Sequence, residues 1–310
     1  MAERITERPR LVVLFVALII LLFLAVPYVF KKQRETPYPP PGTPKLSQMD
    51  YAEIFFDNKD LRLSALVFLP EGEGPHPVAV YIHGSGPSRR SNEWDLPVVK
   101  HLQENGIAVI LPDKRGSEKS EGDWTTATLS DLAEDAISAI EYVKNQDQFD
   151  YSYIGVFGTS QGGWIVSEVA ARSEDVSFVV SASGSTTTTD QQVLYQYTVS
   201  IADKGTYRFI AAIFARFKVD GWKKGDGKYI AGFDPISFWE EVDVPVFFAL
   251  GENDPLVPVE KSIKLLEKLD KDFLITVYPN GRHGLFEPDS FKISDVFLSD
   301  LSEFINSVGE

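Results

Sequence analysis

The run Ile-Gly-Val-Phe-Gly-Thr-Ser-Gln-Gly-Gly, residues 154–163, is the most informative part of this 310-residue sequence. Its apolar first half is typical of a buried strand, and the pattern of residues 161–171 is helical. Residues 158–162 form a G-x-S-x-G pentapeptide around Ser160. On a tight strand-to-helix turn, a side chain at either glycine would crowd the neighbouring strand and helix. A strained serine there holds its hydroxyl above the carboxyl end of a sheet.

Short apolar segments alternate with helical segments on both sides of this run. Residues 51–56 and 61–69 flank a turn at 57–60 and predict an N-terminal hairpin. Further strands are expected at 78–82, 107–111, 153–157, 176–181, 244–250 and 273–278, and helices at 93–104, 129–144, 161–171, 259–269 and 291–308. This alternation predicts the α/β class, with a mostly parallel sheet flanked by helices in a domain of residues 47–310.

Residues 184–240 interrupt the alternation. Two amphipathic stretches, 193–201 and 207–217, predict helices. We therefore expect a small helical cap that leaves from the carboxyl end of a strand and lies on that side of the sheet. We also expect most of its aromatic residues to seat the cap on the domain: Phe209, Phe214, Phe217, Trp222, Tyr229 and Phe233.

Residues 11–30 form a run of twenty without a charge, of which sixteen are Leu, Ile, Val or Phe. A helix of this length spans about 30 Å, the thickness of a bilayer core. We expect a retained transmembrane helix, with a cleaved signal peptide as the open alternative. The proline-rich stretch 36–44 predicts an extended linker, so that residues 1–46 form a membrane anchor and its spacer.

Charge is divided unevenly along the chain. Residues 1–45 carry seven Lys or Arg and three Glu, a net of +4, whereas residues 46–310 carry a net of −19. Since phosphate backbones repel an acidic domain, we expect no nucleic-acid partner. The short basic N-terminus favours a single-pass protein with its globular domain outside the cytoplasm. The absence of cysteine excludes disulfides, thiolate catalysis and cysteine-ligated metals.

A serine hydroxyl needs a base within hydrogen-bond reach to act as a nucleophile. The chain has four histidines, His76, His83, His101 and His283, of which the last alone follows Ser160 in the sequence. His283 stands in a loop directly after the last expected strand of the sheet. A loop at that end of a strand can place the imidazole beside the serine, so we expect His283 to be the base.

The base needs an acid that orients it and stabilises its charged form. Asp254 lies just past the strand expected at 244–250 and is the expected acid; Glu252 in the same loop is the rival. A tetrahedral intermediate also needs two N–H donors. We expect the amide of Gln161, at the start of a helix, and an amide of the loop after the strand at 78–82.

In that second loop the first choice is Ser85 and the second is Gly86. The preceding His83 is expected to be structural rather than catalytic, because it precedes the serine in the chain.

Several motifs together resemble the α/β-hydrolase superfamily, nearest to serine esterases related to the dienelactone-hydrolase and prolyl-oligopeptidase catalytic domains. They are residues 83–87 (His-Gly-Ser-Gly-Pro), 113–116 (Asp-Lys-Arg-Gly) with Ser120 and Gly122, 158–163, 251–258 and 282–284. The Ser…Asp…His order is also that of the superfamily. The resemblance covers about residues 50–308 and implies the α/β-hydrolase fold. Two departures, Glu118 where relatives often carry glycine and the unmatched cap, bear on acyl preference.

These features predict a membrane-anchored serine hydrolase that cleaves small-molecule carboxylic esters through an acyl-enzyme, with no metal or organic cofactor. A serine peptidase or an acyl-thioesterase on the same residues stays open. A non-catalytic anchored binding protein that kept the fold is the alternative from another class. Acyl chain length, physiological substrate and oligomeric state are not determined by the sequence.

Overall fold

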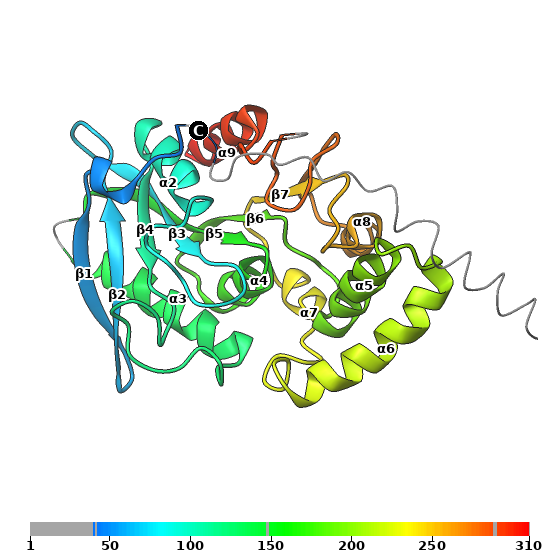
Figure 1. The fold of residues 1–310 in the computed structure, drawn as a ribbon. Helices are drawn as coiled ribbons and strands as arrows, with labels where there is room; N and C mark the ends of the chain where they lie inside the picture. Colours follow the sequence, from blue (N-terminus) through cyan, green and yellow to red (C-terminus); the bar gives the residue numbers. More distant parts are fainter. Residues whose placement is uncertain (1–39, 41, 147–148, 288–289, 310) are drawn as a thin grey trace, which may run out of the picture.

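The computed structural model describes residues 40, 42–146, 149–287 and 290–309. At its centre lies an eight-stranded sheet in the order β1-β2-β4-β3-β5-β6-β7-β8 (Figure 1). The strands are β1 (Ala52–Asn58), β2 (Leu61–Phe68), β3 (His76–Ile82), β4 (Ala108–Pro112), β5 (Tyr151–Thr159), β6 (Val176–Ala182), β7 (Val246–Gly251) and β8 (Leu274–Tyr278). β1 and β2 form the predicted hairpin, β2 pairs antiparallel with β4, and every pair from β4 to β8 is parallel.

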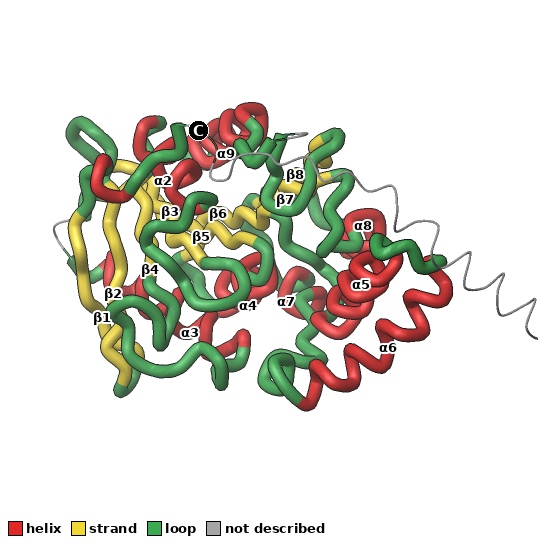
Figure 2. Tube along the Cα trace, in the orientation of Figure 1, coloured by secondary structure: helices red, strands yellow, loops and turns green. Residues whose placement is uncertain are grey.

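Helices cover both faces of the sheet, as predicted (Figures 1 and 2). On one face lie α2 (Asp95–Glu104) and α9 (Asp295–Ser307), and on the other lie α3 (Leu129–Lys144), α4 (Gly162–Arg172) and the short α7 (Ile236–Trp239). α8 (Val259–Leu266) continues into a 3-10 turn, Glu267–Leu269, and another such turn, Leu46–Gln48, precedes β1.

The last helix starts later than the predicted 291, because the Ser294 side chain caps it by accepting from the Phe297 amide.

Each central strand is buried on both faces because helices cover both. In β5, Ile154 and Val156 pack towards α3 and α4, whereas Phe157 packs towards α2 and α9. This explains why the strand that precedes Ser160 has an almost continuous apolar sequence. The end of β5 delivers Ser160 at the carboxyl edge of the sheet.

The predicted cap consists of α5 (Thr189–Ala202) and α6 (Arg208–Lys224), which follow the carboxyl end of β6. The last residues of the segment 184–240 belong to the core of the domain and not to the cap. Trp239 of α7 is fully buried there, and α7 packs against α4.

The expectation that most cap aromatics seat the cap is wrong for Phe209, Phe214 and Phe217, which are 69%, 56% and 71% exposed. α6 packs instead through a face of small residues, Ala211, Ala215 and Val219.

Within the described part of the chain, none of the helices combines the length and the apolar character needed to cross a bilayer. The transmembrane helix predicted at residues 11–30 lies outside the described residues.

Candidate active site

Ser160 occupies a strained turn between β5 and α4. Its φ is +51°, a conformation that costs free energy for a residue with a side chain. The flanking glycines permit this turn: a Cβ at Gly158 would lie 2.4 Å from the Gly162 carbonyl oxygen, and one at Gly162 would lie 2.3 Å from the Ile82 carbonyl oxygen. The steric role predicted for both glycines is therefore confirmed.

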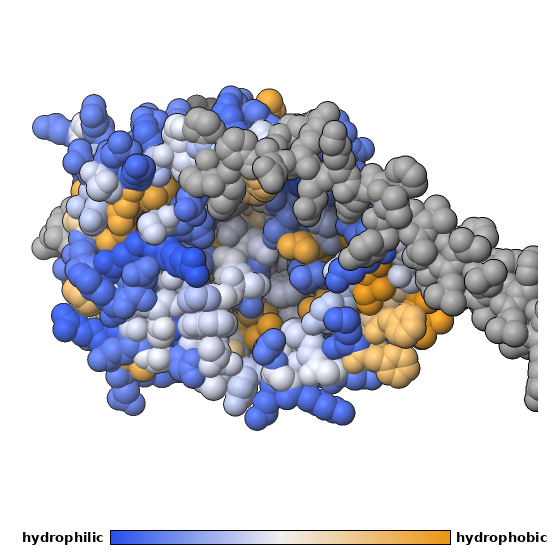
Figure 3. Space-filling model, in the orientation of Figure 1, coloured by the Kyte–Doolittle hydropathy of each residue, from blue (hydrophilic) through white to orange (hydrophobic). Residues whose placement is uncertain are grey.

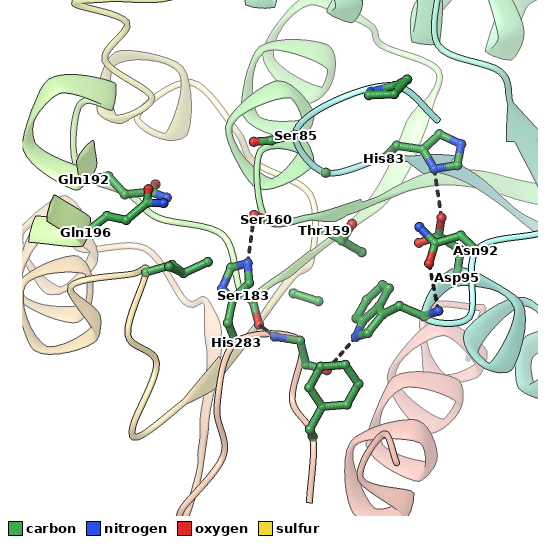
Figure 4. Close-up of a pocket in the computed structure, with 17 residues that line it drawn as sticks. His83, Ser85, Asn92, Asp95, Thr159, Ser160, Ser183, Gln192, Gln196 and His283 are labelled. Atoms are coloured by element: carbon green, nitrogen blue, oxygen red, sulfur yellow. Dashed lines mark hydrogen bonds and ion pairs between the residues drawn. The ribbon is translucent and has the colours of Figure 1, made fainter. Parts of the chain in front are cut away.

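Three loops at the carboxyl edge of the sheet bring Ser160, His283 and Asp254 into contact. Nε2 of His283 lies 3.0 Å from Oγ of Ser160, and Nδ1 of His283 lies 2.8 Å from Oδ2 of Asp254. These residues are separated by up to 123 positions in sequence, yet they form one continuous hydrogen-bonded chain (Figure 4 shows the Ser160–His283 contact). The arrangement lets an imidazole take a proton from a hydroxyl while a carboxylate stabilises the resulting charge.

The loops also fix the Asp254 carboxylate. Its side chain is fully buried, and its second oxygen, Oδ1, accepts the backbone amides of Leu256 at 2.8 Å and Val257 at 3.0 Å. The rival acid, Glu252, points elsewhere and accepts the Asn280 amide at 2.9 Å. The structure thus brings Asp254, and not Glu252, to His283.

The loop that carries His283 is held by two further side chains. The Gly284 amide donates to Oγ of Ser183 at 3.1 Å, and the Gly284 carbonyl accepts from the indole N–H of Trp94 at 2.7 Å. On the cap side, the Tyr195 hydroxyl of α5 donates to the Asp254 carbonyl at 3.2 Å. These contacts fix the backbone on both sides of the imidazole–carboxylate pair.

The two predicted N–H donors flank Ser160. Gln161 is the N-cap of α4, and Ser85 lines the cavity beside Ser160 (Figure 4). The loop of Ser85 runs close to the serine, since a Cβ at Gly84 would lie 3.4 Å from the Ser160 Cβ. No described residue accepts a hydrogen bond from the amide of Ser85 or of Gln161. Both amides are therefore available to an oxyanion.

A buried lysine forms hydrogen bonds with both of the segments that carry these donors. Lys114 follows β4, and its Nζ donates to the carbonyls of Gly84 at 2.5 Å and Gly86 at 2.8 Å, and to the side-chain oxygen of Gln161 at 3.2 Å. Burial lowers the pKa of Lys114 to about 8, against the opposing effect of the Asp95 carboxylate. At neutral pH the protonated amine has three hydrogens for its three acceptors.

The other histidines take part in the structure of the domain. Both ring nitrogens of His83 are engaged, Nδ1 at 3.1 Å from Asp95 and Nε2 at 2.9 Å from the Pro112 carbonyl. His101 on α2 lies 3.1 Å from the Ser302 hydroxyl of α9, and burial lowers its pKa. His76 begins β3. None of the three reaches Ser160 among the described contacts.

A cavity of about 370 Å³ opens at Ser160 and His283. The loop after β3 and the start of α2 form one side, and Gln192 and Gln196 of α5 face the site from the cap (Figure 4). Among the described lining residues, Asp95 is the only acidic side chain; it accepts a hydrogen bond from the Tyr81 hydroxyl and is paired with His83. In the described residues, no three His, Asp or Glu side chains are grouped so as to hold a metal ion.

Comparison with known proteins shows the family of this chain. The model of the prolyl oligopeptidase family matches residues 90–302, which include the serine turn and the loops of Asp254 and His283. The chain belongs to the prolyl oligopeptidase family. This membership confirms the resemblance to α/β-hydrolases of that branch, and the sheet flanked by helices is the α/β-hydrolase fold.

The individual proteins that this chain resembles have low sequence identity to it. Esterase EstD of Thermotoga maritima is 29% identical over 154 residues, which are 47% of this chain and 35% of EstD, so the chain spans about a third of that relative's length. The structure of the Pyrococcus furiosus esterase Pf2001 is similar over 90% of this chain and 99% of its own, with a TM-score of 0.66 at 17% identity. The dienelactone hydrolase of Anabaena variabilis is similar over 83% and 97%, with a TM-score of 0.58 at 19% identity.

Sequence reasoning missed four residues that hold the site: Trp94, Lys114, Ser183 and Tyr195. Each acts through a contact with a backbone group in a distant part of the chain, and a backbone group leaves no residue-specific signal. Lys114 lies within the motif at residues 113–116, but a lysine next to an aspartate and an arginine has the pattern of a solvated charged loop.

Proposed function

We propose that this family member is a membrane-anchored serine hydrolase that cleaves carboxylic esters through an acyl-enzyme. The observation that carries the proposal is the hydrogen-bonded chain from Ser160 through His283 to the buried Asp254. Ser160 Oγ attacks the acyl carbonyl while Nε2 of His283 takes its proton and then passes it to the leaving alcohol. Water, deprotonated by the same nitrogen, releases the acid and restores the serine.

The negative oxygen of the tetrahedral intermediate binds to the amides of Gln161 and Ser85. The strained turn favours this step, since it holds Oγ beside the start of α4, where N–H groups point outward and the helix dipole favours negative charge. Lys114 fixes the distance between the two donors by binding the Ser85 loop and the Gln161 side chain at once. No part of this mechanism requires a cofactor.

An ester substrate fits the cavity better than a peptide with a free amino group. Binding an ammonium group needs an unpaired carboxylate, and the one acidic residue among the described lining residues, Asp95, is already paired with His83. The description of the family as a peptidase family nevertheless makes serine peptidase the second candidate. An acyl-thioesterase would use the same residues.

The test is fluorophosphonate labelling and turnover of the full chain. Wild type is expected to be labelled and to hydrolyse p-nitrophenyl esters, and Ser160→Ala to lose labelling and at least about 10⁴-fold of the rate. A panel of p-nitrophenyl esters, acyl-thioesters and aminoacyl amides separates the three substrate classes. Ester hydrolysis by Ser160→Ala at the wild-type rate would disprove the assignment, and a wild type that takes no label would favour the non-catalytic binding protein.

We further propose that residues 1–46 anchor the hydrolase domain, residues 47–310, to a membrane, and that this domain lies outside the cytoplasm. The twenty-residue apolar run supports the anchor: at about −0.4 kcal/mol for each Leu, Ile, Val or Phe, insertion is favoured by about 6 kcal/mol. The chain should stay in membranes washed with alkaline carbonate. An impermeant fluorophosphonate probe should label it on intact cells; labelling that requires lysis would place the domain inside.

A further inference from the structure

The outer face of α6 is an unusual surface for a domain of this charge. Phe209, Ile213, Phe214 and Phe217 are each more than half exposed. At 100° per residue these positions lie on one side of the helix, opposite the small residues that pack on α5. Figure 3 shows hydrophobic side chains gathered over one end of α6 on a surface that is otherwise largely hydrophilic. Helix period alone would bury these phenylalanines, yet the fold turns them outward.

Positive charge accompanies this apolar face. α6 carries five basic residues against Asp220, a net of +4, within a region of net −19: Arg208, Arg216, Lys218, Lys223 and Lys224. Arg216 and Lys218 fall on opposite borders of the apolar face when the helix is drawn at 100° per residue. Phenylalanines on one side with a basic residue on each border are the composition of helices that lie in the plane of a membrane surface.

We propose that α6 docks the cap on an anionic lipid bilayer, with Phe209, Ile213, Phe214 and Phe217 among the acyl chains and with Arg216 and Lys218 at the headgroups; Lys223 is already paired with Asp190 of α5, and Arg208 lies over the Tyr195 ring of α5. The alternative occupant, a second copy of this chain, is disfavoured by charge. A two-fold contact through α6 would bring together two helices that each carry a net charge of +4. A bilayer with anionic lipids offers the opposite charge instead.

The position of α6 gives this docking a consequence for the site. α5 lies between α6 and the cavity: it packs against α6 and contributes Gln192 and Gln196 to the cavity lining. The described domain begins about ten residues after the apolar run at 11–30. If that run is inserted as proposed, the linker keeps the start of the described domain within about 35 Å of the surface even when fully extended. Tethering at such a distance raises the effective concentration of α6 at the membrane surface, so that even a weak contact is populated.

The experiment uses the cysteine-free full chain, in which one introduced cysteine accepts an environment-sensitive fluorophore. Ile213→Cys places it on the apolar face, and Glu71→Cys, in the exposed loop between β2 and β3, is the matched control. Both proteins are reconstituted into vesicles of phosphatidylcholine and phosphatidylglycerol that contain brominated acyl chains. Quenching of the label at position 213, and not at position 71, is expected. The quenching should weaken when phosphatidylglycerol is omitted or salt is raised.

A second variant tests the apolar contact. Phe209→Ser with Phe217→Ser, added to the labelled Ile213→Cys chain, should lower the docked population, since each phenylalanine removed from the interface costs roughly tenfold in affinity. Hydrolysis of a soluble p-nitrophenyl ester by the same protein reports the proposed function separately. No quenching at position 213 in vesicles that retain the chain would overturn the proposal. Shielding of this label that rises with the number of chains per vesicle and does not depend on the lipid would also overturn the proposal, because it would indicate contact with a second copy of the chain.

Discussion

Replacing Asp254 by asparagine should disable His283 without disturbing the fold, and the hydrogen bonds around the carboxylate dictate how. Oδ1 accepts two backbone amides, from Leu256 and Val257, so an asparagine must keep its carbonyl oxygen there. Its NH₂ group then takes the position of Oδ2, 2.8 Å from Nδ1 of His283. A donor at that place requires a lone pair on Nδ1, which puts the ring proton on Nε2, facing Ser160. That tautomer cannot accept the serine proton.

A loss of about 10⁴-fold in kcat is expected, which corresponds to about 5.5 kcal/mol of transition-state stabilisation. The matched control is Glu252→Gln in the same loop, whose carboxylate accepts only the Asn280 amide in the described structure and should change kcat by less than about threefold. The assay is kcat and KM for a p-nitrophenyl ester, together with the rate of fluorophosphonate labelling and the thermal midpoint of each variant. An Asp254→Asn enzyme within tenfold of wild type, at unchanged thermal midpoint, would refute the reasoning, as would an equal loss in Glu252→Gln.

Two further results are expected, one on the pH dependence of catalysis and one on stability. Burial lowers the pKa of Lys114 to about 8, so above that pH the neutral amine has two hydrogens for three acceptors. The kcat of the wild type should therefore fall as the pH rises above about 8. Lys114→Met should be slower by about tenfold at pH 7 and should lack that decline. A pH–rate profile of both proteins checks this, and the same alkaline decline in Lys114→Met would contradict it. Gly162→Ala should lower the free energy of unfolding by about 1–3 kcal/mol, because its Cβ would lie 2.3 Å from the Ile82 carbonyl oxygen. The control Gly221→Ala, in open space on α6, should raise it by about 0.5–1 kcal/mol in urea titrations, and a Gly162→Ala protein as stable as wild type would show that the turn is not close-packed.

The local pattern of the chain predicted the elements and the order of the reactive residues. Buried strands and amphipathic helices are recognised from the spacing of apolar residues, which depends only on residues close together in the sequence. The helix at 129–144 was predicted with its observed bounds. The glycines around Ser160 likewise act on their own turn. Because β5, β7 and β8 run parallel, the loops after them meet at one edge, and chain order was enough to predict that Ser160, Asp254 and His283 lie there.

Only the tertiary structure showed what holds these groups in register and which way the cap helix faces. Trp94 contacts the loop of His283 from 190 positions away, and Lys114 bridges two loops through backbone oxygens, which every residue possesses. For α6, hydrophobic period favours burial of the phenylalanines, whereas close packing against α5 selects Ala211, Ala215 and Val219. The spacing of hydrophobic residues in the sequence shows that a helix has two different faces, but the shape of the neighbouring helix determines which face is buried.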